Sequence, residues 1–593
     1  MKDYKAENIR NIAVVGHGSE GKTTLVEAML FSTGAIDRQG RVEDGSTTTD
    51  YDPEEVRRGI SISAAIAPLE WKEKKINLID VPGYFDFAGE LVGPLAVCEG
   101  AIITVGAVSG LSVGAEKAWA ACDKAHTSRM IVINQMDREN ANFKKALATI
   151  TDKYGSHIAP IEVPIIENGQ FAGVVCVLEN KAFTGEGKSL KEIPIPASVA
   201  DEVSAAREAI MEAAAGADEA LMERFFENME LSQEDTMLGL RKGITEGTVV
   251  PVVCCSGLTR VGIAKLLDNL IDLMPSPAGQ VLKGVNPKTG DAETRTCAED
   301  QPFSARVFKT VADPYVGKLS LVKVTSGVLA PETALYNANA EKAEKAGGIY
   351  IQRGKKQTQA TKVVAGDICA LAKLQTVATG NTLCDPSKPV KFEDLDFPKP
   401  CISMAVYAKK AGEEDKIFSG LNRLMEEDPT IRVEKDVETT ESLLSGLGEL
   451  HLEVISKKLA AKFGADHLIN AKAGDLEGAV HAIVPAGADT VFECTGIPSC
   501  LDITIPLART LGGFVLQGNY GAAPITYSFL PAHGRRLTWY YPCDDGQAPC
   551  RRAVVKLMAS GALPWQEVIT HRVKAADSAE FYDQINHGAV PGL

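Results

Sequence analysis

The stretch NIAVVGHGSEGKTTLVEAML, residues 11–30, decides the fold of the N-terminal part of the chain. It begins with an apolar run, turns through glycines and continues in a helical pattern, which predicts a strand, a loop and a helix in that order. The loop has the spacing G-x-x-x-x-G-K-[ST], formed by Gly16, Gly21, Lys22 and Thr23. This spacing in this context predicts a P-loop at the start of an α/β domain.

A P-loop binds phosphate groups for two physical reasons. Glycines allow backbone N–H groups to surround the phosphates, and the helix N-terminus adds partial positive charge. We expect Lys22 to reach the β- and γ-phosphates and the Thr23 hydroxyl to ligate Mg²⁺. The expected phosphate-binding residues are Gly16, His17, Gly18, Ser19, Glu20, Gly21, Lys22, Thr23 and Thr24.

A second motif ends the apolar run Ile76–Ile79 in KINLIDVPGYFDF. Its first four residues fit D-x-x-G, in which the Asp holds Mg²⁺ through water and the Gly N–H senses a γ-phosphate. The motif is weak alone, but it gains specificity because it follows Thr23 on a separate predicted strand. The residues assigned to the site are Asp80, Val81, Pro82, Gly83 and Tyr84.

Two later strands supply the recognition of the base. MIVINQMD fits N-[KQ]-x-D, in which the Asp carboxylate accepts hydrogen bonds from the guanine N1 and exocyclic amine, a pattern that selects guanine over adenine. VVPVVCCSG predicts a further strand, and the Ser256–Gly257 pair that follows it stands where a loop packing behind the guanine base is expected. The residues assigned here are Asn134, Gln135, Met136, Asp137, Ser256 and Gly257.

Together with GSTTTDYDPEEVRRGISISAA, these strings resemble the GTPase domain of translation elongation factor G. The resemblance implies a domain over residues 1–280 that binds GTP or GDP with Mg²⁺. It places Ser61 where the family has a metal-binding Thr, so the metal set becomes Thr23, Ser61 and Asp80. Residues 156–246 resemble the insertion of the family and are predicted to be long, acidic and largely helical.

Three positions depart from the family pattern. Tyr84 stands where the family has the His that orients the attacking water. A phenol can hydrogen-bond water but cannot gain a charge as imidazole can, so slow or differently triggered hydrolysis is expected. Gln135 replaces a Lys that packs over the P-loop, and Ser19 stands where Asp is common. The catalytic residues implied are Lys22 and Tyr84, and a paralogous "PGY" branch of the family shares the Tyr.

Composition changes after LMPSPAGQ, and short β-rich runs follow. We interpret residues 281–392 as a β-barrel resembling domain II of elongation factor G, and residues 393–463 as an α+β sandwich resembling its domain III. Leu452, Ile455 and Leu459 recur there at helical spacing. The family resemblance implies the ribosome as a partner of both domains.

After about residue 463 the family pattern stops, and domains IV and V are not recognisable, so the resemblance does not imply translocase activity. FGADHLINAKAGD and GADTVFECTGIPSC instead resemble the C-terminal half of a medium-chain alcohol-dehydrogenase-like protein. The predicted joint lies at residues 457–466, and residues 464–593 are interpreted as a partial Rossmann-like α/β tail. The glycine fingerprint that such proteins carry upstream is replaced here by the helix of GELHLEVISKKL, which argues against NAD(P) chemistry.

The bulk composition limits the classes of function. A net charge of −16 argues against broad, non-specific binding to nucleic acid, and we expect no DNA partner, although docking to RNA through one local patch remains compatible with it. The 13 cysteines follow no metal-binding spacing, and neither Gly100–Ala115 nor Thr510–Gly534 has the character of a membrane span. We therefore expect a cytoplasmic GTPase. The alternatives are a dehydrogenase acting through the tail and a GTP-dependent binding module that does not hydrolyse its nucleotide.

Overall fold

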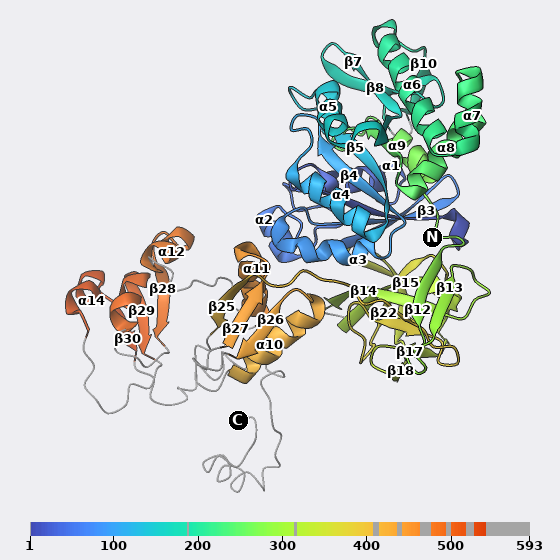
Figure 1. The fold of residues 1–593 in the computed structure, drawn as a ribbon. Helices are drawn as coiled ribbons and strands as arrows, with labels where there is room; N and C mark the ends of the chain where they lie inside the picture. Colours follow the sequence, from blue (N-terminus) through green and yellow to red (C-terminus); the bar gives the residue numbers. More distant parts are fainter. Residues whose placement is uncertain are drawn as a thin grey trace. The chain divides into compact units, whose positions relative to one another are not determined.

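The computed structural model describes residues 2–186, 189–313, 317–331, 333–406, 414–435, 442–462, 476–493, 500–516 and 527–540. The chain divides into two compact units (Figure 1). The first comprises Met1–Tyr407 with Asp415–Asp466, and the second comprises Ala408–Glu414 with His467–Leu593. No helix in the described ranges combines the length and the apolar character needed to cross a bilayer.

The first unit begins with a seven-stranded sheet of order β2-β3-β1-β4-β5-β11-β6. β2 is antiparallel to β3, and the remaining neighbours are parallel. The four apolar runs predicted as strands all lie in this sheet, so the residues that follow them meet at one edge. The strands are β1 (Ile9–Gly16), β2 (Ala65–Trp71), β3 (Lys74–Asp80), β4 (Gly100–Gly106), β5 (Ser128–Asn134), β6 (Ile158–Pro160) and β11 (Val250–Cys254).

Helices cover both faces of this sheet, because every second side chain of a strand points to the same face. Ile12 and Val14 of β1 pack in one apolar cluster with α1 and α9, whereas Ala13 and Val15 pack in another with α4 and α5. The helices are α1 (Lys22–Ser32), α2 (Pro53–Arg58), α3 (Val92–Leu95), α4 (Val113–Ala125), α5 (Phe143–Tyr154) and α9 (Ile263–Leu273), with a 3₁₀ segment η2 (Phe85–Leu91).

The insertion was predicted to be largely helical, but its first part, from β7 to β10, consists of β-strands. A hairpin turns at Asn168 and Gly169, whose φ angles are 50° and 78°, and Asn-Gly is the strongest short hairpin signal. The acidic, Ala-rich composition of the second part obscured this signal, and only that part is helical. The elements are β7 (Glu162–Glu167), β8 (Gln170–Cys176), β9 (Lys181–Thr184), β10 (Lys191–Ile193), α6 (Ala200–Gly216), α7 (Glu219–Asn228) and α8 (Gln233–Glu246).

The following region is all-β, as predicted, and we call it the β region. Its largest sheet is antiparallel and has the order β18-β17-β23-β14-β15-β22-β19-β20. The strands are β12 (Val281–Val285), β13 (Ala292–Thr296), β14 (Ser304–Asp313), β15 (Gly317–Ser326), β16 (Val328–Leu329), β17 (Leu335–Asn337), β18 (Lys342–Glu344), β19 (Gly348–Arg353), β20 (Lys356–Gln359), β21 (Val363–Val364), β22 (Ile368–Ala372), β23 (Thr382–Cys384) and β24 (Lys391–Phe392).

A buried polar network joins the large sheet to the β region. Lys75 of β3 donates to both carboxylate oxygens of Asp367, at 2.8 and 2.7 Å. Asn77 donates to Asp367 at 3.0 Å and to Asn11 at 2.8 Å. All four side chains are nearly inaccessible to solvent. Each polar group in this network has a partner, which is the condition under which buried charge is tolerated.

Replacing Asp367 by Ala is expected to destabilise the first unit strongly, because Lys75 would keep a buried charge without its partner. The expected loss in free energy of unfolding is about 3 kcal/mol or more, measured as a lower urea midpoint of the full chain. Asp291→Ala, at an exposed position, is the control. The double change Lys75→Met with Asp367→Leu should restore most of the stability, and an unchanged midpoint in Asp367→Ala would contradict the argument.

The next region is α+β, as predicted. Its strands form an antiparallel sheet of order β25-β27-β26. Leu452, Ile455 and Leu459, which recur at helical spacing in the sequence, pack in its core together with Leu421 and Leu424. The elements are β25 (Ile402–Val406), α10 (Glu414–Glu427), β26 (Arg432–Lys435), β27 (Ser442–Gly446) and α11 (Glu449–Lys462).

The second unit contains the predicted alternation of helices and parallel strands. Its strands have the order β28-β29-β30, and Phe514 lies at the centre of its apolar cluster. Phe492 of the edge strand β28 is 64% exposed. The predicted strand HLIN (residues 467–470) lies outside the described residues, as do residues 565–573. The elements are α12 (Leu476–Ile483), β28 (Ala488–Glu493), α13 (Leu501–Thr504), β29 (Ala508–Leu516), α14 (Phe529–Arg535) and β30 (Thr538–Tyr540).

Candidate nucleotide-binding site

The P-loop connects β1 to α1 at the carboxyl edge of the large sheet. The Lys22 ammonium donates to the carbonyl oxygens of His17 at 2.6 Å and of Gly16 at 3.3 Å, so it lies inside the loop. Burial lowers the pKa of Lys22, and the carboxylate of Asp80 acts in the opposite direction. A buried cation surrounded by backbone groups is suited to an anionic ligand such as a phosphate.

The D-x-x-G segment lies directly against the P-loop. A Cβ atom added to Gly83 would be 2.3 Å from Lys22 Nζ and 2.6 Å from the backbone nitrogen of Gly18, so only glycine fits there. The Tyr84 ring lies over Gly18, since a Cβ at Gly18 would be 3.1 Å from ring atom Cε2. Tyr84 is 37% exposed. The structure therefore brings the two predicted catalytic residues, Lys22 and Tyr84, to the same loop.

The three predicted metal ligands converge beside the P-loop. The hydroxyl oxygens of Thr23 and Ser61 are 3.0 Å apart. Asp80 is buried at the end of β3, and its Oδ1 atom has no hydrogen-bond partner among the described residues. Burial raises the pKa of Asp80, although hydrogen bonds from Thr49 and Thr23 and the charge of Lys22 act in the opposite direction. An unpartnered buried carboxylate oxygen next to two hydroxyls fits the oxygen ligands that Mg²⁺ prefers.

The sequence reasoning missed a second buried carboxylate at this place. Asp50 is 5% exposed, and its Oδ2 atom also has no hydrogen-bond partner among the described residues. Burial, followed by the nearby Asp80 carboxylate, raises the pKa of Asp50 to about 8. The preceding Thr49 donates to Asp80 Oδ2 at 2.8 Å. No motif spacing marks Asp50 and Thr49; their loop places them beside β3 only in the folded chain.

The two base-recognition motifs are held together by hydrogen bonds. Asn134 donates from Nδ2 to the carbonyl oxygens of Glu20 at 3.0 Å and Gly21 at 3.3 Å, and its Oδ1 accepts the N–H of Gly257 at 3.1 Å. Asn134 is thus a bridge between the P-loop and the last motif. The Ser256 hydroxyl donates to Asp137 Oδ1 at 2.5 Å, which orients the carboxylate expected to meet guanine.

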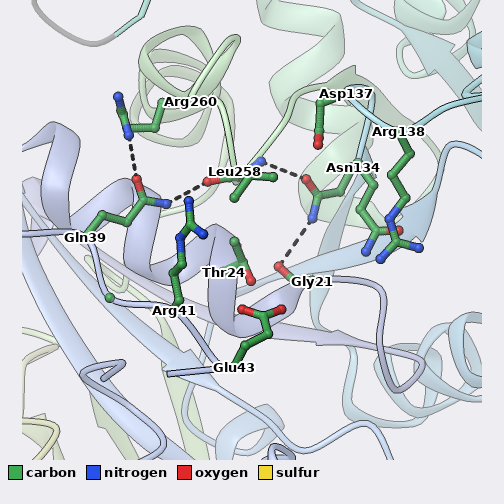
Figure 2. Close-up of a pocket in the computed structure, with 13 residues that line it drawn as sticks. Gly21, Thr24, Gln39, Arg41, Glu43, Asn134, Asp137, Arg138, Leu258 and Arg260 are labelled. Carbon is green, nitrogen blue, oxygen red and sulfur yellow. Dashed lines mark hydrogen bonds between the residues drawn. The ribbon is translucent and has the colours of Figure 1, made fainter. Parts of the chain in front are cut away.

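A cavity of about 230 Å³ lies between these motifs (Figure 2). Six of the predicted residues line it, namely Gly21, Thr24, Asn134, Gln135, Asp137 and Gly257. Gln135 donates to the Ser19 carbonyl at 2.9 Å, so it still packs over the P-loop in place of the Lys of the family. In contrast, the side chains of Val81 and Met136 lie in the apolar core, so only their backbone can serve the site. Pro82 is also buried.

The opposite wall of the cavity was not predicted. Gln39 donates to the carbonyl of Gly257 at 2.8 Å and accepts from Arg260 at 2.9 Å, which closes the loop after α1 onto the base side (Figure 2). These residues belong to loops without a recognisable motif, so the sequence carries no signal for them. The other unpredicted lining residues are Gly40, Arg41, Glu43, Arg138 and Leu258.

Comparison with family models assigns the regions in order. Residues 7–276 match the elongation factor Tu GTP binding domain, residues 302–386 match elongation factor G domain 2, and residues 397–471 match elongation factor G domain III. Residues 454–554 match a zinc-binding dehydrogenase model. The last two matches overlap over residues 454–471, a range that contains the predicted joint at residues 457–466.

A solved structure is similar to most of this chain in fold and sequence. The crystal structure of ttk003000868 from Thermus thermophilus has a TM-score of 0.69 and 32% sequence identity to this chain. The match covers 77% of this chain and 66% of that one, so this chain spans just under two thirds of the length of the other protein. The chain therefore contains, in order, regions similar to the elongation factor Tu GTP binding domain and to elongation factor G domains 2 and III, followed by a segment similar to zinc-binding dehydrogenases.

Proposed function

We propose that the chain binds GTP with Mg²⁺ and hydrolyses it slowly, exchanging between GTP and GDP states. The observation that carries the proposal is that the P-loop and the two base motifs line one cavity, while the hydroxyls of the expected metal ligands Thr23 and Ser61 meet beside the same loop. Asp137 accepts the guanine donors, and the residues predicted from the motifs form the site, with Val81 and Met136 contributing only through their backbone.

The residues of the chain would divide the work as follows. Lys22 and the P-loop amides bind the β- and γ-phosphates and stabilise the charge that develops during in-line attack by water. Thr23, Ser61 and Asp80 are the residues that would hold Mg²⁺. The metal supplies charge neutralisation on the phosphate oxygens when bound. Tyr84 orients the water through its hydroxyl, without the ability to take up a proton.

Tyr84 also supports a second candidate, a binding module that changes state with GTP but does not hydrolyse it. Its ring lies over Gly18 in the position where the resembling family has His. The two candidates share the nucleotide site and differ only in turnover. For the tail we propose no NAD(P) chemistry, because helix α11 occupies the position where a glycine fingerprint would be needed.

The test measures binding of a fluorescent GTP analogue and release of phosphate, with and without ribosomes. Mg²⁺-dependent binding with slow phosphate release, accelerated by ribosomes, would support the GTPase proposal and the approach to the ribosome through domains II and III. Binding without any release would favour the second candidate. Absence of binding would overturn both. We propose domain limits of 1–280, 281–392, 393–463 and 464–593, which limited proteolysis can check.

Replacing Tyr84 by His is expected to increase the rate of GTP hydrolysis by about 10-fold or more, because an imidazole can exchange a proton with the attacking water. The measurement is single-turnover phosphate release at saturating GTP. Tyr84→Phe is the matched control, since it keeps the ring over Gly18 and removes only the hydroxyl. Equal rates in all three proteins would show that this position does not contribute to the chemistry.

A further inference from the structure

The turn between β19 and β20 brings the β region into contact with the nucleotide-binding part of the first unit. Arg353 pairs with Lys356 across the hairpin, so Gly354 occupies the first position of a two-residue turn, with φ +49°. Arg353 donates to the carbonyl of Pro68 in β2 at 3.0 Å and to the carbonyl of Ala35 after α1 at 2.6 Å. Ala35 precedes and Pro68 follows the segment that contains Gln39, which closes the cavity. The turn is therefore hydrogen-bonded to the chain on both sides of that segment.

Gly354 makes the closest approach. Its N–H donates to the carbonyl of Ile66 in β2 at 2.8 Å. A Cβ atom at this position would lie 1.9 Å from the carbonyl oxygen of Thr48. The carbonyl oxygen is a backbone atom and the Cβ is bonded directly to the backbone, so rotation of a side chain cannot relieve the collision. Any side chain at Gly354 would therefore displace the chain at Thr48.

Thr48 is held on its other side by the helix that follows the P-loop. Its N–H donates to Glu27 Oε2 at 3.0 Å, and its hydroxyl donates to Glu27 Oε1 at 3.2 Å. Glu27 of α1 is 1% exposed and also accepts the N–H of Gly40 at 3.0 Å. Thr48 thus lies between the β19–β20 turn and α1, in contact with Gly354 on one side and hydrogen-bonded to Glu27 on the other.

The residues next to Thr48 are those that meet the proposed metal site. Thr49 donates to Asp80 Oδ2 at 2.8 Å, and Asp50 follows with a buried oxygen that has no hydrogen-bond partner within the described ranges. A shift of Thr48 would move the neighbouring Thr49 and so disturb its hydrogen bond to Asp80. Loops of this kind become ordered when Mg²⁺ and a γ-phosphate are bound, so their position sets nucleotide preference.

We propose that Arg353 and Gly354 are positioning residues of the β region that hold residues 48–50 in the place required for Mg²⁺-dependent GTP binding. The inference rests on the proposed nucleotide-binding function and adds a residue pair outside the nucleotide-binding domain to its machinery. Because coupling is reciprocal, bound GTP should in turn stabilise the turn against the large sheet.

The experiment compares Gly354→Ala with Gly290→Ala in the full chain. Gly290 also has a positive φ, +78°, in a hairpin of the β region, but a Cβ there meets nothing within 4 Å, so it reproduces the backbone strain without the collision. We expect Gly354→Ala to weaken GTP binding in Mg²⁺ by about 5- to 20-fold, GDP binding by less, and binding in EDTA not at all, whereas Gly290→Ala changes none of these. Hydrogen exchange of residues 40–50 without nucleotide should become faster only in Gly354→Ala.

Arg353→Lys provides a second variant in case Gly354→Ala fails to fold. Lysine keeps the charge but has one donor group instead of a fork, so one of the two carbonyl contacts is lost. We expect a weaker form of the same pattern, including faster exchange of residues 40–50. If both variants match Gly290→Ala in the GTP-to-GDP affinity ratio and in exchange, the inference is wrong. If the unmodified chain binds neither nucleotide, the proposed function itself fails.

Discussion

Replacing Lys22 by Met is expected to abolish GTP binding at micromolar nucleotide concentrations. Lys22 is the buried cation of the P-loop, and Met has a similar length without charge or donors. Hydrogen bonds to charged groups contribute about 1.5–3 kcal/mol each, so the loss of two contacts to the phosphates corresponds to about 100-fold weaker binding or more. The measurement is a titration with a fluorescent GTP analogue in Mg²⁺.

The fold should survive this change, because removing a buried charge also removes its desolvation cost. Lys124→Met serves as the control, since Lys124 is 71% exposed on α4 and forms an ion pair with the exposed Asp396. Comparable melting temperatures for the two variants would show that the loss of binding is local. GTP affinity within threefold of the unmodified chain in Lys22→Met would contradict the assignment of the P-loop.

Replacing Asp137 by Asn is expected to remove the preference for guanine. The carboxylate of Asp137 is oriented by Ser256 and accepts two donors of the base in our proposal. An amide offers one acceptor and turns its NH₂ group toward the guanine amine, so about 100-fold weaker GTP binding is expected. Xanthosine triphosphate carries a carbonyl oxygen in place of that amine, so its affinity should rise. Competition of GTP and of xanthosine triphosphate against a fluorescent GTP analogue measures the two affinities, and their ratio shows whether the preference has changed.

Asp152→Asn controls for the loss of one negative charge, because Asp152 is exposed on α5. It should leave both affinities unchanged. If Asp137→Asn weakens both nucleotides equally, the residue acts through the fold of the loop rather than through the base. If it weakens neither, the guanine site lies elsewhere.

The motifs were predictable because their chemistry depends on short-range spacing. Gly16 through Thr24 run without interruption from the end of β1 into the first turn of α1, and each later motif begins where a strand ends, as with Asp80 at the end of β3. Parallel strands bring these ends to one edge, so recognition of the strands was sufficient to assemble the site. The parallel strands of the second unit, β28 and β29, were also predictable, because each is a short apolar run between helical segments.

Other features had no local signal or an ambiguous one. The hairpin at Asn168 was obscured by the helical composition of the following segment, although its turn residues were visible. Gln39 and Asp50 belong to a loop whose residues carry no periodicity, so nothing in their spacing showed that they would close the cavity or add a carboxylate beside Asp80. Val81 and Met136 fall within motifs, but their side chains point into the apolar core rather than toward the site.

The sequence by itself determined the strand–loop–helix order, the identity of the nucleotide motifs and the joint between two families, because each depends on residues close together in the chain. Tertiary structure alone decided that Gly354 meets Thr48 and that Lys75 pairs with Asp367. The partners in these contacts are far apart in the chain, and they meet only because the β region packs against the large sheet. Contacts of that kind depend on packing between regions, which no local pattern encodes.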